Sequence, residues 1–160
     1  MPYLIDGYNL ARVSRHNDRQ SNQEINGLVR FLNRFARLKK TRVTVVFDGF
    51  PPDWNRSHRL STAFDAVRIL FAGDETDADT KIRNMIGSLQ NRSGWTVVSS
   101  DRAVHGYARA SGVRAIRSDE FLLIADKAFS QRVKEDPEVR SEEVDYWLEI
   151  FGEKKTRGPS

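Results

Sequence analysis

Residues 43–49 read VTVVFDG, a run of five apolar or β-branched residues followed by an acid and a glycine. Such a run, bounded by turn residues, is typical of a buried strand. Four further stretches have the same form, and each is soon followed by a turn residue or an acid. They are YLI (3–5), VRILF (67–71), TVV (96–98) and RAI (114–116). The sequence therefore predicts five short strands.

Helical patterns lie between these strands. Ser21 and Glu24 have the spacing of a capping box, which marks a helix start. The apolar stripe that follows comprises Ile25, Leu28, Val29, Leu32, Phe35 and Ala36, and a second stripe comprises Ile82, Met85, Ile86 and Leu89. Gly94 is a stop signal for the second helix, and further helices are predicted over 102–110, after Ser118 and after Ser141. Strands alternating with helices predict an α/β fold, with a parallel sheet and helices on both faces.

Length and composition narrow the class of protein. A chain of 160 residues predicts one domain, which we place at residues 1–151, with a disordered basic tail at 152–160. The absence of cysteine excludes disulfides, thiolate metal sites and a cysteine nucleophile. No apolar run approaches the roughly 20 residues that span a bilayer, and the N-terminus lacks the pattern of a signal peptide. We therefore expect a cytoplasmic protein with no membrane partner, and no feature of the sequence indicates an oligomeric state.

The basic residues are unevenly distributed. The net charge is +4, yet residues 12–42 hold nine basic residues, Arg12 and Arg15 among them, against two acids. A surface with this bias attracts polyanions such as nucleic acid. The alternative is a solvated helix face, which is the commoner meaning of a run of charge.

Acids follow the predicted strands. Asp6, Asp48, Asp101 and Asp119 come just after apolar runs, and the acid-rich stretch DETDAD (74–79) follows the run at 67–71. All carboxyl ends of a parallel sheet meet at one edge, where ligands bind, so we expect these acids to converge. The alternative for each acid is structural, since aspartate is a favoured N-cap and suits the first turn of a helix.

Clustered carboxylates predict a cation. They raise one another's pKa unless a cation offsets them, and oxygen ligands suit Mg²⁺ or Mn²⁺. Such a site fits metal-assisted hydrolysis of a phosphodiester, with basic residues holding the nucleic-acid backbone. Other chemistries lack their motifs, because the chain has no GxGxxG, GxxxxGK[ST], HExxH or GxSxG.

Four motifs resemble a known family. LIDGYNL (4–10), VVFDG (45–49), DADTKI (77–82) and VVSSDRAV (97–104) occur in the order found in NYN domains, and are most similar to the YacP-like branch of the PIN-like nucleases. The resemblance covers about residues 3–124. It implies a PIN-like three-layer sandwich with a central, mostly parallel five-stranded sheet. It also implies a metal-dependent endoribonuclease acting on RNA associated with translation, with mRNA on the ribosome as a candidate partner.

The resemblance assigns roles to single residues. Asp6, Asp79 and Asp101 would be metal ligands and catalytic residues, and Asp48 would lie at the pocket edge as a further ligand. Asn9 would shape the pocket or contact the phosphate. Ser100, beside Asp101, completes the motif and is a candidate RNA contact.

One departure leaves the third ligand open. Family members often have ETAD where this chain has ETDAD, so Glu75, Asp77 or Asp79 could face the metal. Helical spacing places Glu75 and Asp79 on one face, which would leave Asp77 to serve as N-cap. We favour Asp79, with Asp77 as the second candidate for the catalytic carboxylate.

The segment 50–66 has two prolines and no clear periodicity, so a loop is predicted there. Its residues Trp54, Arg56 and Arg59 could stack on unpaired bases and hold phosphates. The alternative is a Trp54 packed against the core.

Two other functions of the protein also remain as hypotheses. One is a catalytically silent PIN-like module that binds RNA or the ribosome, and the other is a structure-specific DNA nuclease.

Overall fold

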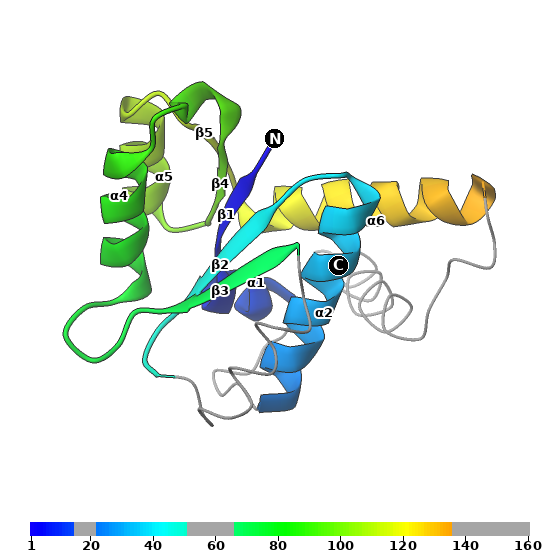
Figure 1. Ribbon diagram of the computed structural model, residues 1–160, viewed down its shortest axis with the longest axis horizontal. Coiled ribbons are helices and arrows are strands. Elements are labelled where there is room, and N and C mark those ends of the chain that lie inside the picture. The colour runs from blue at the N-terminus through cyan, green and yellow to red at the C-terminus, as the bar shows by residue number, and fades with distance from the viewer. Residues whose placement is uncertain (15–21, 51–65, 136–160) are drawn as a thin grey trace, which may run out of the picture.

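A five-stranded sheet forms the centre of the computed structural model, which describes residues 1–14, 22–50 and 66–135 (Figure 1). The strands are β1 (Tyr3–Asp6), β2 (Val43–Phe47), β3 (Val67–Phe71), β4 (Thr96–Val98) and β5 (Arg114–Ile116). Their order is β3-β2-β1-β4-β5, and every pair is parallel. All five predicted strands are present, and the sheet expected to be mostly parallel is parallel throughout.

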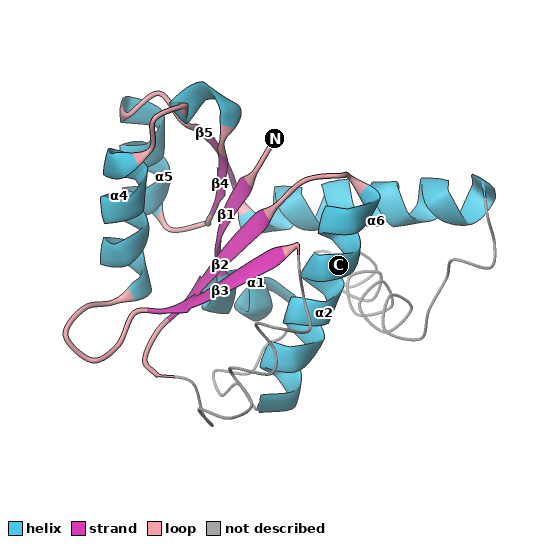
Figure 2. Ribbon diagram, in the orientation of Figure 1, coloured by secondary structure: helices cyan, strands magenta, loops and turns pink. Residues whose placement is uncertain are grey.

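Helices cover both faces of the sheet (Figure 2). Helices α4 (Ala78–Ser88) and α5 (Arg102–Ala110) lie on one face. Helices α1 (Gly7–Ser14), α2 (Asn22–Leu38) and α6 (Ser118–Glu135) lie on the other. A 3₁₀ turn, η1 (Arg92–Gly94), precedes β4. This is the three-layer sandwich that the sequence predicts.

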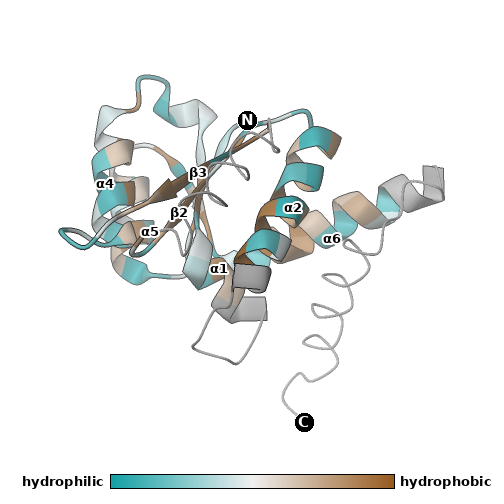
Figure 3. Ribbon diagram, turned by 60° about the horizontal axis from the view of Figure 1, so that its bottom comes forward, coloured by the Kyte–Doolittle hydropathy of each residue, from teal (hydrophilic) through white to brown (hydrophobic). Residues whose placement is uncertain are grey.

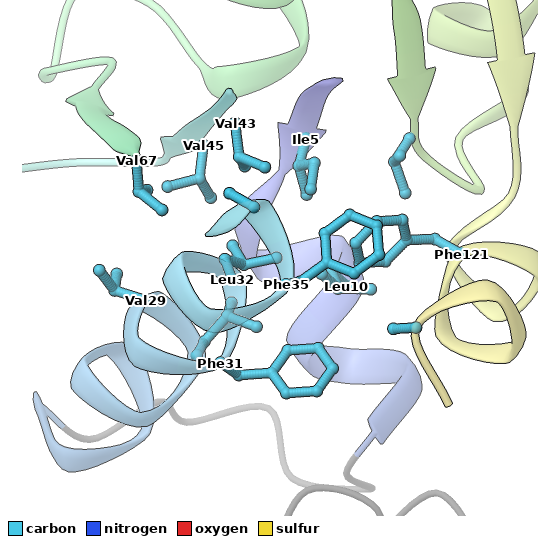
Figure 4. Close-up of a cluster of buried hydrophobic side chains, with 14 of the residues drawn as sticks. Ile5, Leu10, Val29, Phe31, Leu32, Phe35, Val43, Val45, Val67 and Phe121 are labelled. Carbon is cyan, nitrogen blue, oxygen red and sulfur yellow. The ribbon is translucent and has the colours of Figure 1, made fainter. Parts of the chain in front are cut away.

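Alternation along the strands divides the core into two layers, because successive side chains point to opposite faces. Ile5, Val45 and Val98 pack with α1, α2 and α6, whereas Leu4, Val46 and Val97 pack with α4 and α5. The predicted stripe of α2 is buried along its whole length against the sheet (Figure 4). Coloured by hydropathy, the strands form an apolar layer between helices with hydrophilic outer faces (Figure 3).

The structure corrects the predicted burial of two strands. VRILF and RAI read as buried strands, but they are β3 and β5 at the two edges of the sheet. Only Val67 of β3 and Ile116 of β5 are fully buried, and Arg68 and Arg114 are exposed. An apolar run indicates a strand, but the number of neighbouring strands and helices decides how much of it is covered.

The first helix was not predicted, and a glycine makes it possible. Helix α1 begins at Gly7, directly after β1, so the chain turns at once beneath the sheet. A Cβ at Gly7 would lie 2.4 Å from the ring of Phe47 on β2, far inside contact distance. Gly7 therefore lets α1 start against β2 and holds the residues after Asp6 close to the sheet edge.

Helix α4 ends at Ser88, before Gly94, which belongs to η1. Other predictions lie outside the described residues. They are the capping-box residue Ser21, the helix after Ser141, the basic tail, and the predicted loop at 50–66, of which only the first and last residues are described. No helix in the described part of the chain is long and apolar enough to cross a membrane.

Candidate active site

The strand order places a crevice at the carboxyl end of β1. From β1 the chain first adds β2 and β3 on one side of β1, and then adds β4 and β5 on the other side. Ligands of open parallel sheets bind where the order reverses in this way. A cavity of about 210 Å³ lies there, and its lining is Asp6, Tyr8, Asn9, Asp48, Asp77, Asp79 and Asp101. Acids from four separate segments of the chain thus share one cavity.

Asp6 lies at the bottom of this set and is almost fully buried. The backbone N–H of Asn9 donates to Asp6 Oδ1 over 3.4 Å. Burial, followed by the negative charges of Asp79 and Asp48, raises the pKa of Asp6 to about 7. Burial and the charge of Asp101 also raise the pKa of Asp79, whose carboxylate accepts a hydrogen bond from the protonated Asp6. Burial and the neighbouring negative charges therefore favour the protonated form of Asp6 when no cation offsets them.

The start of α4 carries the remaining acids of the stretch 74–79. Asp77 is the N-cap, and its Oδ1 accepts the backbone N–H of Thr80 over 2.7 Å. Hydrogen bonds from the Thr80 side chain and then from its backbone N–H lower the pKa of Asp77. Asp79 follows in the first turn and faces Asp6, whereas Glu75 is exposed and does not line the cavity. The predicted division between a capping Asp77 and an inward Asp79 is what the structure has, although Asp77 also borders the cavity.

Asp48, the residue after β2, forms a hydrogen bond to the start of α4. Its Oδ1 accepts the backbone N–H of Ala78 over 2.7 Å, so it satisfies a free amide at the start of a helix that belongs to another segment. The next residue, Gly49, has φ +74° and pairs with Gly73 in an antiparallel bridge. This bridge joins the chain after β2 to the chain after β3, directly beside Asp48.

Asp101 begins α5. Its Oδ1 accepts the N–H of Val104 over 3.0 Å, and its own N–H donates to the buried Ser99 Oγ over 3.1 Å. One carboxylate oxygen therefore caps the helix, while the residue also lines the cavity. Asp101 therefore caps a helix and borders the cavity, and its role as a metal ligand stays a prediction.

The sequence matches the family described as the YacP-like NYN domain over residues 3–154. The chain belongs to this family. Its fold is similar to two crystal structures of Rae1 (YacP) from Bacillus subtilis. A point mutant matches at a TM-score of 0.69 and 16% identity, covering 98% of this chain and 99% of that one. A second structure matches at a TM-score of 0.65 and 20% identity, covering 99% and 95%. No curated protein matches the chain. YacP-like NYN domains are nuclease-like, and their resemblance to this sequence is confirmed.

Within this YacP-like domain, Tyr8 is a cavity residue that the sequence interpretation missed. Its ring packs edge-on against Phe47 at 5.2 Å between centroids. Burial and the charge of Asp48 raise the pKa of its hydroxyl, which therefore remains protonated. The available signal was its place in DGYN, between two residues that were already assigned to the pocket.

Other predicted site residues lie elsewhere. Ser100 is not among the cavity-lining residues, because its Oγ accepts the N–H of Ser118 over 3.1 Å. Asp119 is exposed and forms a surface ion pair with Arg117 at 3.7 Å, so it does not join the other strand-end acids. Arg12 belongs to α1, but its side chain is not described. The remaining candidate RNA contacts, Arg15, Trp54, Arg56 and Arg59, lie outside the described residues.

The donor atoms of the cavity fit a hard divalent cation. Every charged group in the lining is a carboxylate, and oxygen ligands suit Mg²⁺ and Mn²⁺. Among the described residues, no three histidine, cysteine or acidic side chains are already gathered into a group that could hold a metal ion. Mg²⁺ commonly uses only one or two protein carboxylates and keeps several waters. The Asp6–Asp79 pair, with Asp101 and Asp48 nearby, suits such an open site better than a closed cage.

Proposed function

We propose that this protein is a metal-dependent endoribonuclease that hydrolyses RNA phosphodiester bonds at the aspartate-lined cavity. One observation carries the proposal: Asp6 and Asp79, brought together from β1 and α4, line one cavity at the sheet edge with Asp48 and Asp101. Carboxyls packed in this way cost stability when both ionise, and a cation offsets that cost. Asp6 also accepts the N–H of Asn9 at the start of α1, as an N-cap does, so its capping contact and its place in the cavity occur together.

Asp6, Asp79, Asp101 and Asp48 are the residues that would hold Mg²⁺ or Mn²⁺. Bound there, the ion would activate water for attack and neutralise charge on the phosphate. The chain's own contribution is to fix these carboxylates in place. Asp48 and Asp101 each hold a helix N-terminus while bordering the cavity, so the ligands are anchored to rigid elements.

The substrate class follows from the family and the charge. The family is nuclease-like, and a net charge of +4 with a basic bias over residues 12–42 suits a polyanionic partner. We extend the proposal to RNA associated with translation, in the cytoplasm, on the family resemblance. Asn9 and Tyr8 are the uncharged polar residues of the cavity, and their side-chain donors suit phosphate or ribose oxygens.

A cleavage assay tests the proposal. Mixed single-stranded RNA is incubated with the parent protein in Mg²⁺ or Mn²⁺, with chelator, and beside DNA strands of matched sequence. Cleavage of RNA that requires the metal and disappears in Asp6→Asn is the expected result. Asp119→Asn is the matched control, because it removes the same charge from a strand-end acid outside the cavity and should cleave like the parent.

Three other results would contradict the proposal. Salt-sensitive RNA binding without any metal-stimulated product would identify a binding module rather than a nuclease. Cleavage by Asp6→Asn at the parent's rate would show that the cavity is not the active site. Preferential cleavage of the DNA strands would assign the metal chemistry to a DNA nuclease.

A further inference from the structure

A buried hydrogen-bond cluster lies behind the cavity. The side-chain oxygen of Asn9 accepts two hydrogen bonds, from the backbone N–H of Ser100 over 2.9 Å and from the hydroxyl of Ser118 over 2.6 Å. The backbone N–H of Ser118 in turn donates to Ser100 Oγ over 3.1 Å. Three segments far apart in the sequence, at the starts of α1 and α6 and after β4, therefore meet at one amide oxygen.

This cluster decides which way the Asn9 amide faces. A backbone N–H can only donate, so the atom that meets Ser100 N must be the oxygen Oδ1 and not the nitrogen. Both donors are on the protein side, which leaves Nδ2 as the polar atom that Asn9 offers to the cavity it lines. In a lining whose charged groups are all carboxylates, this N–H₂ is a fixed, uncharged donor.

Ser118 lies on the far side of this amide. It is the first residue of α6, is completely buried and is not among the cavity-lining residues. Ser118 itself does not line the cavity, so it can affect a bound substrate only through its hydrogen-bond partners Asn9 and Ser100. Its hydroxyl and its N–H are both used within the cluster.

We propose that Ser118 is a positioning residue for the cavity: its hydroxyl locks the Asn9 amide so that Nδ2 is presented to a phosphate oxygen of the substrate. The proposal rests on the proposed nuclease function. Without the Ser118 hydroxyl, Asn9 Oδ1 keeps only the Ser100 N–H, and one hydrogen bond no longer fixes both the tilt and the direction of the amide. The substrate then meets a donor that must be ordered during the reaction, which slows turnover.

A double-mutant cycle tests the proposal. Ser118→Ala should lower kcat for metal-dependent RNA cleavage roughly tenfold with a smaller change in KM, as expected for one positioning hydrogen bond. In an Asn9→Ala background the same Ser118→Ala change should cause no further loss, because the hydroxyl of Ser118 no longer has the Asn9 amide to orient. Thr96→Val is the control: it removes a buried hydroxyl at the start of β4, at the opposite end of the sheet, and should not alter kcat.

The outcomes separate this proposal from the proposed function. If the parent cleaves RNA and Ser118→Ala cleaves equally well, or if the two losses simply add, the positioning role is overturned and the nuclease stands. If the parent does not cleave RNA, the side-chain amide signals of Asn9 in a nitrogen–proton NMR spectrum decide. A shift and faster exchange of those signals in Ser118→Ala, with the Asn26 amide on α2 unchanged, supports the lock, and unchanged Asn9 signals overturn it.

Discussion

Asp6, at the end of β1, and Asp79, in the first turn of α4, share a hydrogen bond at the bottom of the cavity. The proton sits on Asp6, because burial penalises its charged form most. A proton on Asp6 and a bound cation would each offset the repulsion between the two carboxyls. This would link the stability of the fold to pH and to metal.

The first prediction concerns the stability of the metal-free protein. The pKa of Asp6 is about 7 in the folded state, against 3.8 ordinarily, so the folded protein holds this proton more tightly than the unfolded chain. The protonated Asp6 therefore contributes to the free energy of unfolding. This contribution is fully present below the ordinary pKa and is lost as the pH rises through about 7. Urea unfolding with chelator present should give a lower free energy of unfolding near pH 8 than near pH 5.5, by an amount on the order of 1–3 kcal/mol.

Asp6→Asn supplies the control for this prediction. An asparagine keeps an oxygen that can accept the Asn9 N–H but carries no titrating proton. The variant should show a smaller decline in stability between the two pH values and should be more stable than the parent near pH 8. An equally steep decline in the variant would assign the pH dependence to other groups.

The second prediction concerns metal binding as a stability measurement. A ligand that binds only the folded state stabilises it by about 2.7 kcal/mol at a hundredfold excess over its dissociation constant. Mg²⁺ or Mn²⁺ near pH 8 should therefore raise the melting temperature of the parent. The rise should be much smaller in Asp79→Asn, while the exposed Asp119→Asn should respond like the parent. Equal responses in all three proteins would place the metal outside the cavity.

The third prediction separates Asp77 from Asp79. Asp77 caps α4 through the N–H of Thr80, and a serine can make the same hydrogen bond. Asp77→Ser should keep the melting temperature and most of the cleavage activity, and Asp77→Ala should lower the melting temperature because the cap is lost. Asp79→Asn should keep the fold and lose cleavage. Loss of cleavage in Asp77→Ser, with Asp79→Asn active, would reverse the assignment.

The fourth prediction concerns Asp48, which we expect to have two roles: it caps α4, and it supplies a negative charge to the cavity. Asp48→Asn keeps an oxygen for the N–H of Ala78, so the start of α4 should stay in place while cleavage falls with the lost charge. Asp48→Ala removes that acceptor as well, and should lower both the melting temperature and cleavage. Thermal melts and cleavage rates of the two variants, measured together, separate these parts. Identical melting temperatures would show that the Ala78 hydrogen bond contributes nothing.

The convergence of the aspartates at the sheet edge could be predicted from the sequence, because it follows from the topology of a parallel sheet. Asp6, Asp48 and Asp101 follow parallel strands, and parallel strands end at one edge whatever their order. Asp119 obeys the same rule in sequence yet lies outside the cavity, because β5 is the edge strand farthest from β2. Strand order, which the sequence does not encode locally, decides which strand-end acids meet.

The cluster behind the cavity could not be predicted in the same way. Ser118 and Asn9 are connected only because α6 begins beside the end of β1, and no spacing in the sequence relates them. The role of Ser100 also depends on this packing, since its hydroxyl faces α6. Side chains that act through hydrogen bonds between distant segments need the folded arrangement to be recognised.

The last prediction concerns Tyr8, whose protonated hydroxyl lines the cavity beside the carboxylates. Tyr8→Phe removes that donor and keeps the ring that packs on Phe47, so the melting temperature should stay close to the parent's. Cleavage should fall roughly tenfold, as expected when one hydrogen bond to the substrate is lost, and the pH profile should keep its shape because the phenol does not titrate near neutral pH. Tyr107→Phe is the matched control, since Tyr107 is an exposed tyrosine of α5 outside the cavity lining, and it should leave cleavage unchanged. Parent-like cleavage by Tyr8→Phe would reduce Tyr8 to a packing residue of the cavity wall.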